Sequence, residues 1–293
     1  MDDWALNPST DRPKHGVCTP PTRGTYVKGS APAPSATTGR WLVLTSGEED
    51  KKDVLDALRG ACPELDTIPC SDPIRPSLLN QFTAVIDLCT LTSDALIRSL
   101  LVRNMPVVAV NKESAAYSVN SVLMDTVLGA TRLCRDLILA GHRRIAALEA
   151  RGSTRISDAL RVAGSRYGSQ VLVEAAEARE AAALVDDGVT GLVCESIRSA
   201  SVARAVLDAR GIRVPDQVSL TAVGCGANPE CSGYFVDARQ IADAVSGLLK
   251  EVPLRPVALW MSPNWVDRGT LSPVALSVPL DQLVSHSEAH AIQ

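Results

Sequence analysis

The chain contains few aromatic residues and no long uninterrupted apolar run. Phenylalanine, tryptophan and tyrosine make up 3% of its 293 residues, although 46% of the residues are hydrophobic. Aliphatic side chains must therefore build the core. No apolar run reaches the roughly 18 residues that a membrane-spanning helix needs. The start of the chain has acidic residues and no apolar segment, so it does not resemble a signal peptide. We expect a cytoplasmic globular protein without a membrane partner.

An excess of basic charge is also missing, and so is any paired-cysteine motif. The formal net charge is −4, which argues against a chain-wide polyanion-binding surface but leaves room for a small basic module. The eight cysteines are scattered, mostly inside apolar runs, and no CxxC occurs. This pattern indicates small buried hydrophobes in a reducing compartment, with a metal site or a disulfide set as the alternative.

The common catalytic motifs are absent. The sequence contains no G-x-S-x-G, HExxH, Walker A or GxGxxG pattern. Cys225, which lies between two glycines, is one nucleophile candidate, but no base can be placed beside it. Three of the four histidines fall in expected coil. We therefore expect no catalytic residue, no metal and no cofactor, and keep an enzyme that uses Cys225 as a third alternative.

Residues 1–40 differ in composition from the rest of the chain. They are rich in proline, serine, threonine and glycine, which cannot build a packed domain alone. Within them, two short β-prone pieces surround a Pro-Pro pair in residues 16–29 and predict a small hairpin. Residues 30–40 are typical of a flexible linker.

From Trp41 onward, strand patterns and helix patterns alternate. This alternation predicts a parallel sheet with right-handed crossovers. The expected strands of this first unit are 41–46, 64–70, 84–90, 106–111 and 117–123. The first expected helix begins at Ser46 and the acids that follow it and ends at residue 58. Two further helices are expected at 77–82 and 92–103.

The stretch 125–148 joins this first unit to a second one. It predicts an amphipathic helix that stops at Gly141, a basic turn at 142–144 and a buried strand. We interpret the basic turn as solvated, with anion binding as the alternative. The rhythm then repeats with strands at 143–150, 170–176, 190–196, 214–225 and 256–261, and helices at 155–167, 179–187, 197–210 and 238–250.

The predicted fold class is α/β, with two doubly wound parallel-sheet lobes, a hinge and an inter-lobe cleft. Ligands of open parallel sheets bind at the carboxyl ends of the strands, so both lobes should present such an edge to the cleft. We assign residues 41–142 plus about 228–252 to the first lobe. Residues 143–227 plus about 253–282 form the second lobe, and 283–293 form a frayed tail.

Several motifs in this order resemble the lactose- and galactose-repressor (LacI/GalR) regulators. D-x-x-x-G-A at 125–130 and L-I-x-x-G-H-R-R-I-A at 137–146 are similar to that family's lobe junction. Three further stretches are similar to its other motifs: 106–111, 211–220 and 261–270. The resemblance implies a periplasmic-binding-protein-like I fold, small effectors such as sugars or nucleobases, a homodimer and control of transcription.

The hairpin region carries a second resemblance. Residues 23–27, RGTYV, are similar to the last wing strand of a GntR-type winged helix. That resemblance implies DNA contacts by Arg23, Gly24 and Thr25. The 15 residues before the hairpin are too short for the helices of such a head, so either the head was lost or the true start lies upstream. A chance hairpin is the alternative.

The LacI/GalR resemblance also suggests residues for effector binding. Arg155 falls at the position of a ligand-binding arginine in that family, and Ser196 replaces part of an Asn-Asp pair. The acids expected after the fourth second-lobe strand are missing, which puts sugar binding of the usual kind in doubt. Our candidates are Arg155, Ser46, Asp125 and Ser196. A surface arginine, an N-cap serine and a junction helix cap are the respective alternatives for Arg155, Ser46 and Asp125.

The leading prediction is a transcriptional regulator of GntR/LacI-hybrid type, with a LacI/GalR-like core that senses a small, sugar-like molecule. It should bind DNA only weakly, or through a head that lies upstream. The alternative is a headless small-molecule-binding or protein-interaction module without DNA-binding activity.

Overall fold

The chain divides into two compact units, Met1–Thr38 and Gly39–Gln293. The computed structural model describes residues 17–18, 26–27, 39–46, 51–62, 64–69, 74, 76–89, 92–112, 118–167, 172–226, 229–251, 253 and 255–274. In the first unit, β1 (Val17–Cys18) and β2 (Tyr26–Val27) pair antiparallel. The predicted hairpin is therefore confirmed. Arg23, Gly24 and Thr25 lie outside the described residues, so their contact with DNA stays a prediction.

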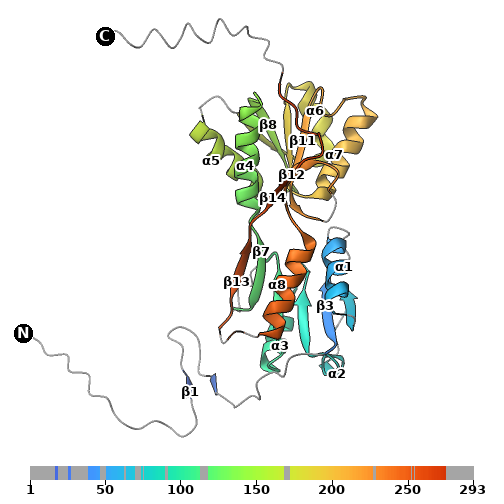
Figure 1. Ribbon diagram of the computed structural model, residues 1–293, viewed down its shortest axis with the longest axis vertical. Helices are drawn as coiled ribbons and strands as arrows, with labels where there is room; N and C mark the ends of the chain where they lie inside the picture. Colours follow the sequence, from blue (N-terminus) through green and yellow to red (C-terminus); the bar gives the residue numbers. More distant parts are fainter. Residues whose placement is uncertain are drawn as a thin grey trace, which may run out of the picture. The chain divides into compact units, whose positions relative to one another are not determined.

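The second unit contains two six-stranded sheets, each with its own helices (Figure 1). The first sheet has the order β13-β7-β6-β5-β3-β4, and all of its strand pairs are parallel. Its strands are β3 (Trp41–Thr45), β4 (Leu65–Pro69), β5 (Ala84–Asp87), β6 (Val107–Val110), β7 (Asn120–Met124) and β13 (Ala258–Met261).

The second sheet has the order β14-β12-β11-β10-β8-β9. Its pairs are parallel except for β12 with β14, which run antiparallel. Its strands are β8 (Arg144–Leu148), β9 (Leu172–Ala176), β10 (Gly191–Cys194), β11 (Ser219–Cys225), β12 (Ser232–Val236) and β14 (Asn264–Val266).

Helices cover both faces of each sheet, and this arrangement explains the apolar strands. Along β3, Trp41 and Val43 face one core, whereas Leu42 and Leu44 face the other. Alternate side chains of a strand point to opposite faces, so a strand covered on both faces is apolar throughout.

On the first sheet, α1 (Lys52–Ala61) and α8 (Ala238–Lys250) cover one face, and α2 (Pro76–Leu79) and α3 (Asp94–Val102) cover the other. On the second sheet, α4 (Thr126–Leu139) and α5 (Arg155–Tyr167) share a face, opposite η2 (Ala178–Glu180), α6 (Ala181–Asp186) and α7 (Ile197–Ala209).

The chain passes between the two sheets three times, after β7, β12 and β13. An aspartate caps the helix that follows each of the first two passages. Asp125 Oδ1 accepts a hydrogen bond from Leu128 N at 2.9 Å, and Asp237 Oδ1 accepts one from Arg239 N at 2.7 Å. The predicted α/β class with two doubly wound lobes is confirmed.

The last part of the chain is distributed between the sheets differently from our expectation. Residues 228–252, expected in the first lobe, include β12, which pairs with β11 of the second sheet. Residues 253–282, expected in the second lobe, include β13, which pairs with β7 of the first sheet. We did not predict β12 because no helix separates it from β11, so the strand-and-helix rhythm gave no signal there.

Two local expectations need correction. The helix expected from Ser46 begins at Lys52, and its N-cap is Lys51, so Ser46 does not cap it. Cys89 is disulfide-bonded, so for this residue the alternative of a disulfide holds in place of a buried free thiol; Cys62, Cys134, Cys194, Cys225 and Cys231 are free. Over the described part of the chain, every helix is too short or too polar to cross a membrane.

Candidate functional site

Each sheet has one place where neighbouring strands connect in opposite directions. In the first sheet, β4 lies on one side of β3 and β5 on the other. In the second sheet, β9 and β10 flank β8 in the same way. The connections on the two sides of β3, and on the two sides of β8, therefore run in opposite directions. This reversal opens a crevice at the carboxyl ends of the strands, where ligands of such sheets bind. We call these places the β3/β5 crevice and the β8/β10 crevice.

Asp87, the last residue of β5, lies at the β3/β5 crevice and is fully buried. Its Oδ1 accepts hydrogen bonds from Cys89 N at 3.0 Å and from Thr92 Oγ1 at 2.7 Å. Its Oδ2 lies 2.6 Å from Lys112 Nζ. A buried carboxylate is tolerated only with such partners, so this network fixes both the carboxylate and the lysine.

Two lysines make contacts at the end of β5. Lys112 follows β6 by two residues, and Lys51, at the start of α1, donates a hydrogen bond to Leu88 O. Asn111, directly before Lys112, has a φ of +56°. This left-handed conformation is one that asparagine tolerates better than most residues. The end of β5 is thus contacted by two cations, Lys112 at the Asp87 carboxylate and Lys51 at the Leu88 carbonyl.

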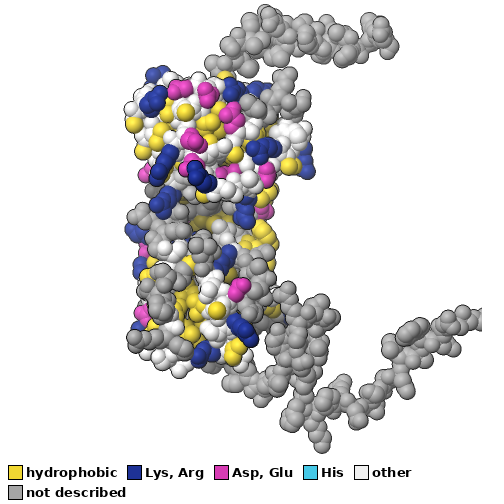
Figure 2. Space-filling view, turned by 180° about the vertical axis from the view of Figure 1, so that it is seen from behind, with side chains coloured by type: hydrophobic (Ala, Val, Ile, Leu, Met, Phe, Trp, Pro, Cys, Tyr) yellow, Lys and Arg dark blue, Asp and Glu magenta, His cyan; other side chains and the backbone are white. Residues whose placement is uncertain are grey.

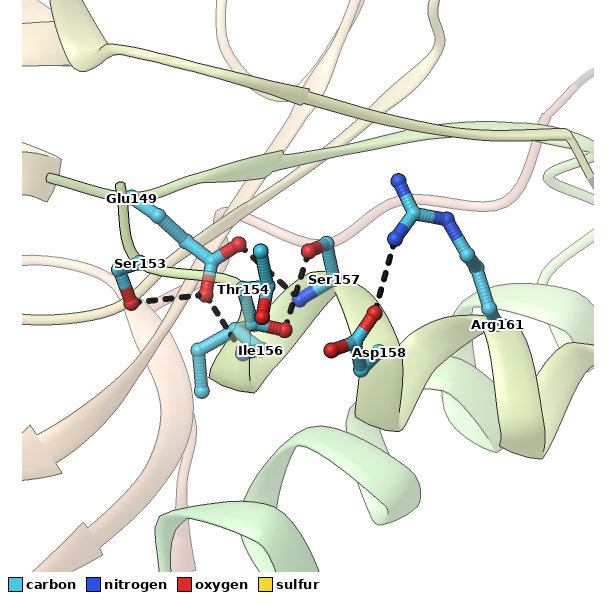
Figure 3. A network of polar contacts seen from close by, with 7 residues as sticks. All are labelled: Glu149, Ser153, Thr154, Ile156, Ser157, Asp158 and Arg161. Atoms are coloured by element: carbon cyan, nitrogen blue, oxygen red, sulfur yellow. Dashed lines mark hydrogen bonds and ion pairs between the residues drawn. The ribbon is translucent and has the colours of Figure 1, made fainter. Parts of the chain in front are cut away.

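At the β8/β10 crevice, Glu149 places a buried carboxylate over the first turn of α5 (Figure 3). Oε1 accepts from Ile156 N at 2.6 Å and from Ser153 Oγ at 3.3 Å, while Oε2 accepts from Ser157 N at 3.2 Å. Backbone N–H groups at a helix start lack intrahelical partners and favour negative charge. Glu149 therefore already occupies the place where a bound anion would otherwise lie.

The other side of this crevice is also held by backbone contacts. Glu195 Oε1 accepts a hydrogen bond from Ala150 N at 2.6 Å, which links the ends of β8 and β10. Ser196 is the N-cap of α7: its Oγ accepts from Ser199 N, and Ser199 Oγ accepts from Ser196 N, both at 3.0 Å.

The two crevices face the same region between the lobes. A Cβ added at Gly226, which follows β11, would lie 3.4 Å from Asp53 Oδ2 in the first turn of α1. Cys225 lies in the same place, and burial first, then the charges of Asp53 and Asp237, raises the pKa of its thiol to about 12. A thiol with so high a pKa forms almost no thiolate near neutral pH, which argues against a nucleophilic role for Cys225.

The structure places the predicted effector residues in different surroundings. Ser46 follows β3 and is exposed at the β3/β5 crevice, and Ser196 lies at the β8/β10 crevice. Arg155 is the exposed first residue of α5 and makes no hydrogen bond or ion pair with another described residue. Asp125 caps α4 after β7, two strands away from β5. Its expected role as a junction cap is thus confirmed, and its binding role stays a prediction.

Within the basic turn at 142–144, Arg143 is exposed as we expected of a solvated turn, whereas His142 is buried. His142 is 2% exposed; its Nδ1 lies 3.0 Å from Thr190 Oγ1, and its Nε2 lies 3.1 Å from both Ser272 O and Ser219 Oγ. Gly141, at a φ of +93°, ends α4 as predicted. The His142 side chain lies inside because its imidazole joins the starts of β10 and β11 to the segment after β14. Anion binding by this turn stays a prediction.

Sequence reasoning missed Asp87, Lys112 and Glu149. All three lie in or directly after expected strands, at 84–90, 106–111 and 143–150. Their position after apolar runs was a usable signal. However, only the strand order shows that they lie beside a crevice, and the sequence does not give that order.

Two further features bear on the site. The described residues contain no cluster of three or more metal-ligating side chains. A hollow of about 300 Å³ lies along α7, away from the ends of β3, β5 and β8, and is lined by Ile197, Ala200, Ser201, Arg204, Asp208, Leu220, Glu230 and Cys231. Its one guanidinium is 3.3 Å from Asp208 Oδ1. We place the candidate effector site at the crevices because both lobes contribute to that region.

No family model and no curated protein matches this sequence. Solved structures do match it, and several of them are LacI-family transcriptional regulators. A LacI transcriptional regulator from a Rhodococcus species is 23% identical, with a TM-score of 0.66 over 80% of this chain and 99% of that chain. A LacI family regulator from Enterococcus faecium with bound ribose is 14% identical, with a TM-score of 0.66 over 80% of this chain and 100% of that one. One from Arthrobacter sp. FB24 in complex with lactose is 17% identical, with a TM-score of 0.65 and the same coverage. The matches confirm the predicted periplasmic-binding-protein-like fold.

Proposed function

We propose that this chain is a transcriptional regulator of GntR/LacI-hybrid type whose two-lobed core senses a small molecule. One observation carries the proposal: the strand-end crevices of both lobes face one region, where Gly226 of the second lobe approaches Asp53 of the first. Several solved structures that share this fold are LacI-family regulators, among them structures with bound ribose, lactose and sucrose. These likenesses support a small-molecule effector.

The proposed mechanism is a shift between two lobe arrangements. A ligand that contacts both crevices binds one arrangement more tightly and so raises its population. Three chain passages connect the lobes, and two of them begin helices capped by Asp125 and Asp237. A change in lobe angle in a homodimer would alter the spacing of two DNA-binding heads. Arg23, Gly24 and Thr25 are the proposed DNA contacts of each head.

A thermal-shift screen against sugars, nucleobases and sugar phosphates tests the effector part. A ligand at about 100 times its Kd adds ~2.7 kcal/mol of stability, which raises Tm by roughly 5–10 °C for a domain of this size. Gly226→Trp should abolish the ligand-induced rise, because even a Cβ there would lie 2.2 Å from Ile197 Cδ1 and 3.4 Å from Asp53 Oδ2. Gly60→Trp, at an exposed position with open space around it, is the matched control. A rise that persists in Gly226→Trp would place the ligand elsewhere.

The regulatory part needs a separate measurement. Residues 1–293 should bind promoter DNA weakly at physiological salt, because phosphate binding requires many basic contacts and the hairpin region offers few. Light scattering should show a dimer. Ligand binding together with a complete lack of DNA binding, at low salt as well, would favour the headless module over the regulator.

A further inference from the structure

We propose that the β3/β5 crevice binds an anionic group of the effector, a carboxylate or a phosphate, through the ammonium of Lys112. Asp87 is the residue that positions this lysine. The inference rests on the proposed function and deepens it, because it names the chemical class of the ligand and the lobe that its charged end contacts.

The geometry of Asp87 explains why Lys112 is held in place. Oδ1 already accepts two hydrogen bonds, from Cys89 N and Thr92 Oγ1. Oδ2 is buried, and the Lys112 ammonium, 2.6 Å away, is its partner there. A lysine side chain held this way has already lost much of the rotamer freedom that ligand binding would otherwise remove.

Lys112 keeps donors for a ligand. An ammonium group has three N–H donors, and the contact with Asp87 engages one side of it. The Lys112 side chain remains 19% exposed, whereas the Asp87 side chain is fully buried. Lys51, whose ammonium donates to Leu88 O, adds a second cation beside the end of β5. Asp53, in the first turn of α1, lies toward Gly226 of the second lobe.

The backbone amides at the β8/β10 crevice are already occupied by carboxylates of the protein. The amides of Ile156 and Ser157, which begin α5, already donate to the buried carboxylate of Glu149. Ala150 N donates to Glu195. At the β8/β10 crevice the carboxylates of Glu149 and Glu195 lie near the exposed Arg155, the one cation there that we proposed for effector binding. The β3/β5 crevice instead offers Lys112, which Asp87 holds in place, so we assign the anionic end of the ligand to the first lobe.

Two variants test the charge of Lys112 without leaving the Asp87 carboxylate buried and unpaired. Lys112→Met alone would leave a buried, unpaired carboxylate and risks unfolding. Asp87→Asn keeps the Oδ1 acceptor for Cys89 N and Thr92 Oγ1, so Asp87→Asn/Lys112→Met removes both charges and keeps those bonds. Asp87→Asn alone retains the cation. Lys250→Met, at an exposed position at the end of α8, is the control for a lost lysine.

Calorimetric titration would compare gluconate, ribose 5-phosphate and inorganic phosphate with neutral ribose and lactose. We expect an anionic probe to bind the wild type and Lys250→Met alike, and to bind Asp87→Asn more weakly than these but more tightly than the double variant, because Lys112 keeps its charge and loses the carboxylate that positions it. Binding to the double variant should be about tenfold weaker or more, since a charge-assisted hydrogen bond is lost. The salt dependence of the affinity should also become shallower in the double variant.

Other results would overturn the inference in distinguishable ways. If neutral sugars bind and the double variant binds them as well as the wild type does, with no anion bound, the anion site is wrong and the proposed function stands. If an anion binds the double variant as tightly as the wild type, Lys112 does not hold it. If none of these probes and no compound of the broader thermal-shift screen binds the wild type, the proposed function fails together with the inference.

Discussion

His142 is a buried, titratable residue that contributes to the stability of the second lobe. Burial first lowers the pKa of His142 below its ordinary value of 6.5; the hydrogen bond to Ser272 O opposes this shift, and the charge of Arg143 adds to it. The folded lobe therefore holds a neutral imidazole that joins Thr190, Ser219 and Ser272. Charging this imidazole in the folded state is unfavourable because the surrounding backbone carbonyl and hydroxyl groups replace only part of its hydration.

The sign of the resulting pH dependence follows from proton linkage. The unfolded chain binds the proton at about the ordinary pKa of 6.5, whereas the folded chain binds it only at a lower pH. The stability that this residue contributes is complete above the unfolded pKa of 6.5. It is lost as the pH falls from there toward the lower pKa of the folded protein, by at most ~1.4 kcal/mol per pH unit. Urea unfolding between neutral pH and about pH 5 should show this loss, and His142→Asn should reduce its slope. An equal slope in both proteins would exclude His142 as the cause.

Helices and strands set limits that no single side chain shows. β11 and β12 lie so close together that a Cβ at Gly233 would be 1.9 Å from Ala222 O, a backbone atom that cannot move aside. Gly247, on an exposed position of α8, has nothing within 4 Å of its Cβ position. Gly233 is therefore required by the close approach of a neighbouring strand, whereas the position of Gly247 has room for a side chain. The sequence alone does not distinguish these two cases.

This contrast predicts opposite effects of the same substitution. Gly233→Ala should destabilise the second lobe by several kcal/mol, roughly as an overpacked core does or more, because the β11–β12 ladder must separate. Gly247→Ala should stabilise the protein by about 0.5–1 kcal/mol, because alanine favours an exposed helix more than glycine does. Urea midpoints of the two variants test both effects. A mild effect at Gly233 would mean that β12 is not held against β11 as described.

Element-scale patterns also explain how much was predictable from sequence. Helix periodicity and capping residues placed α5 and α8 at their observed bounds, because each has an apolar stripe and clear ends. The short strand β12 was missed, since it follows β11 without a helix between them. Sequence reasoning proposed Ser46 because it ends an expected strand and Ser196 through the LacI/GalR resemblance, whereas Asp87, Lys112 and Glu149 needed the strand order. Their function depends on contacts between residues far apart in the sequence, such as Asp87 and Lys112.

For the whole molecule, charge distribution fits a small-ligand protein better than a chain-wide polyanion binder. Basic and acidic side chains are interspersed on the visible face of the second lobe in Figure 2, and no face of one sign stands out there. The net charge of −4 agrees with this pattern. DNA recognition in the proposed mechanism therefore depends on the hairpin unit, and effector sensing depends on the region between the crevices.

Hydrogen-exchange mass spectrometry with the ligand identified in the thermal-shift screen tests the central claim most directly. Amide protection reports local opening, and a ligand shared by two surfaces reduces opening at both. We predict added protection in peptides from both crevices, around 85–92 and 108–112 in the first lobe and around 148–157 and 194–199 in the second. Protection confined to one lobe, or to the hollow along α7, would contradict a shared effector site between the lobes.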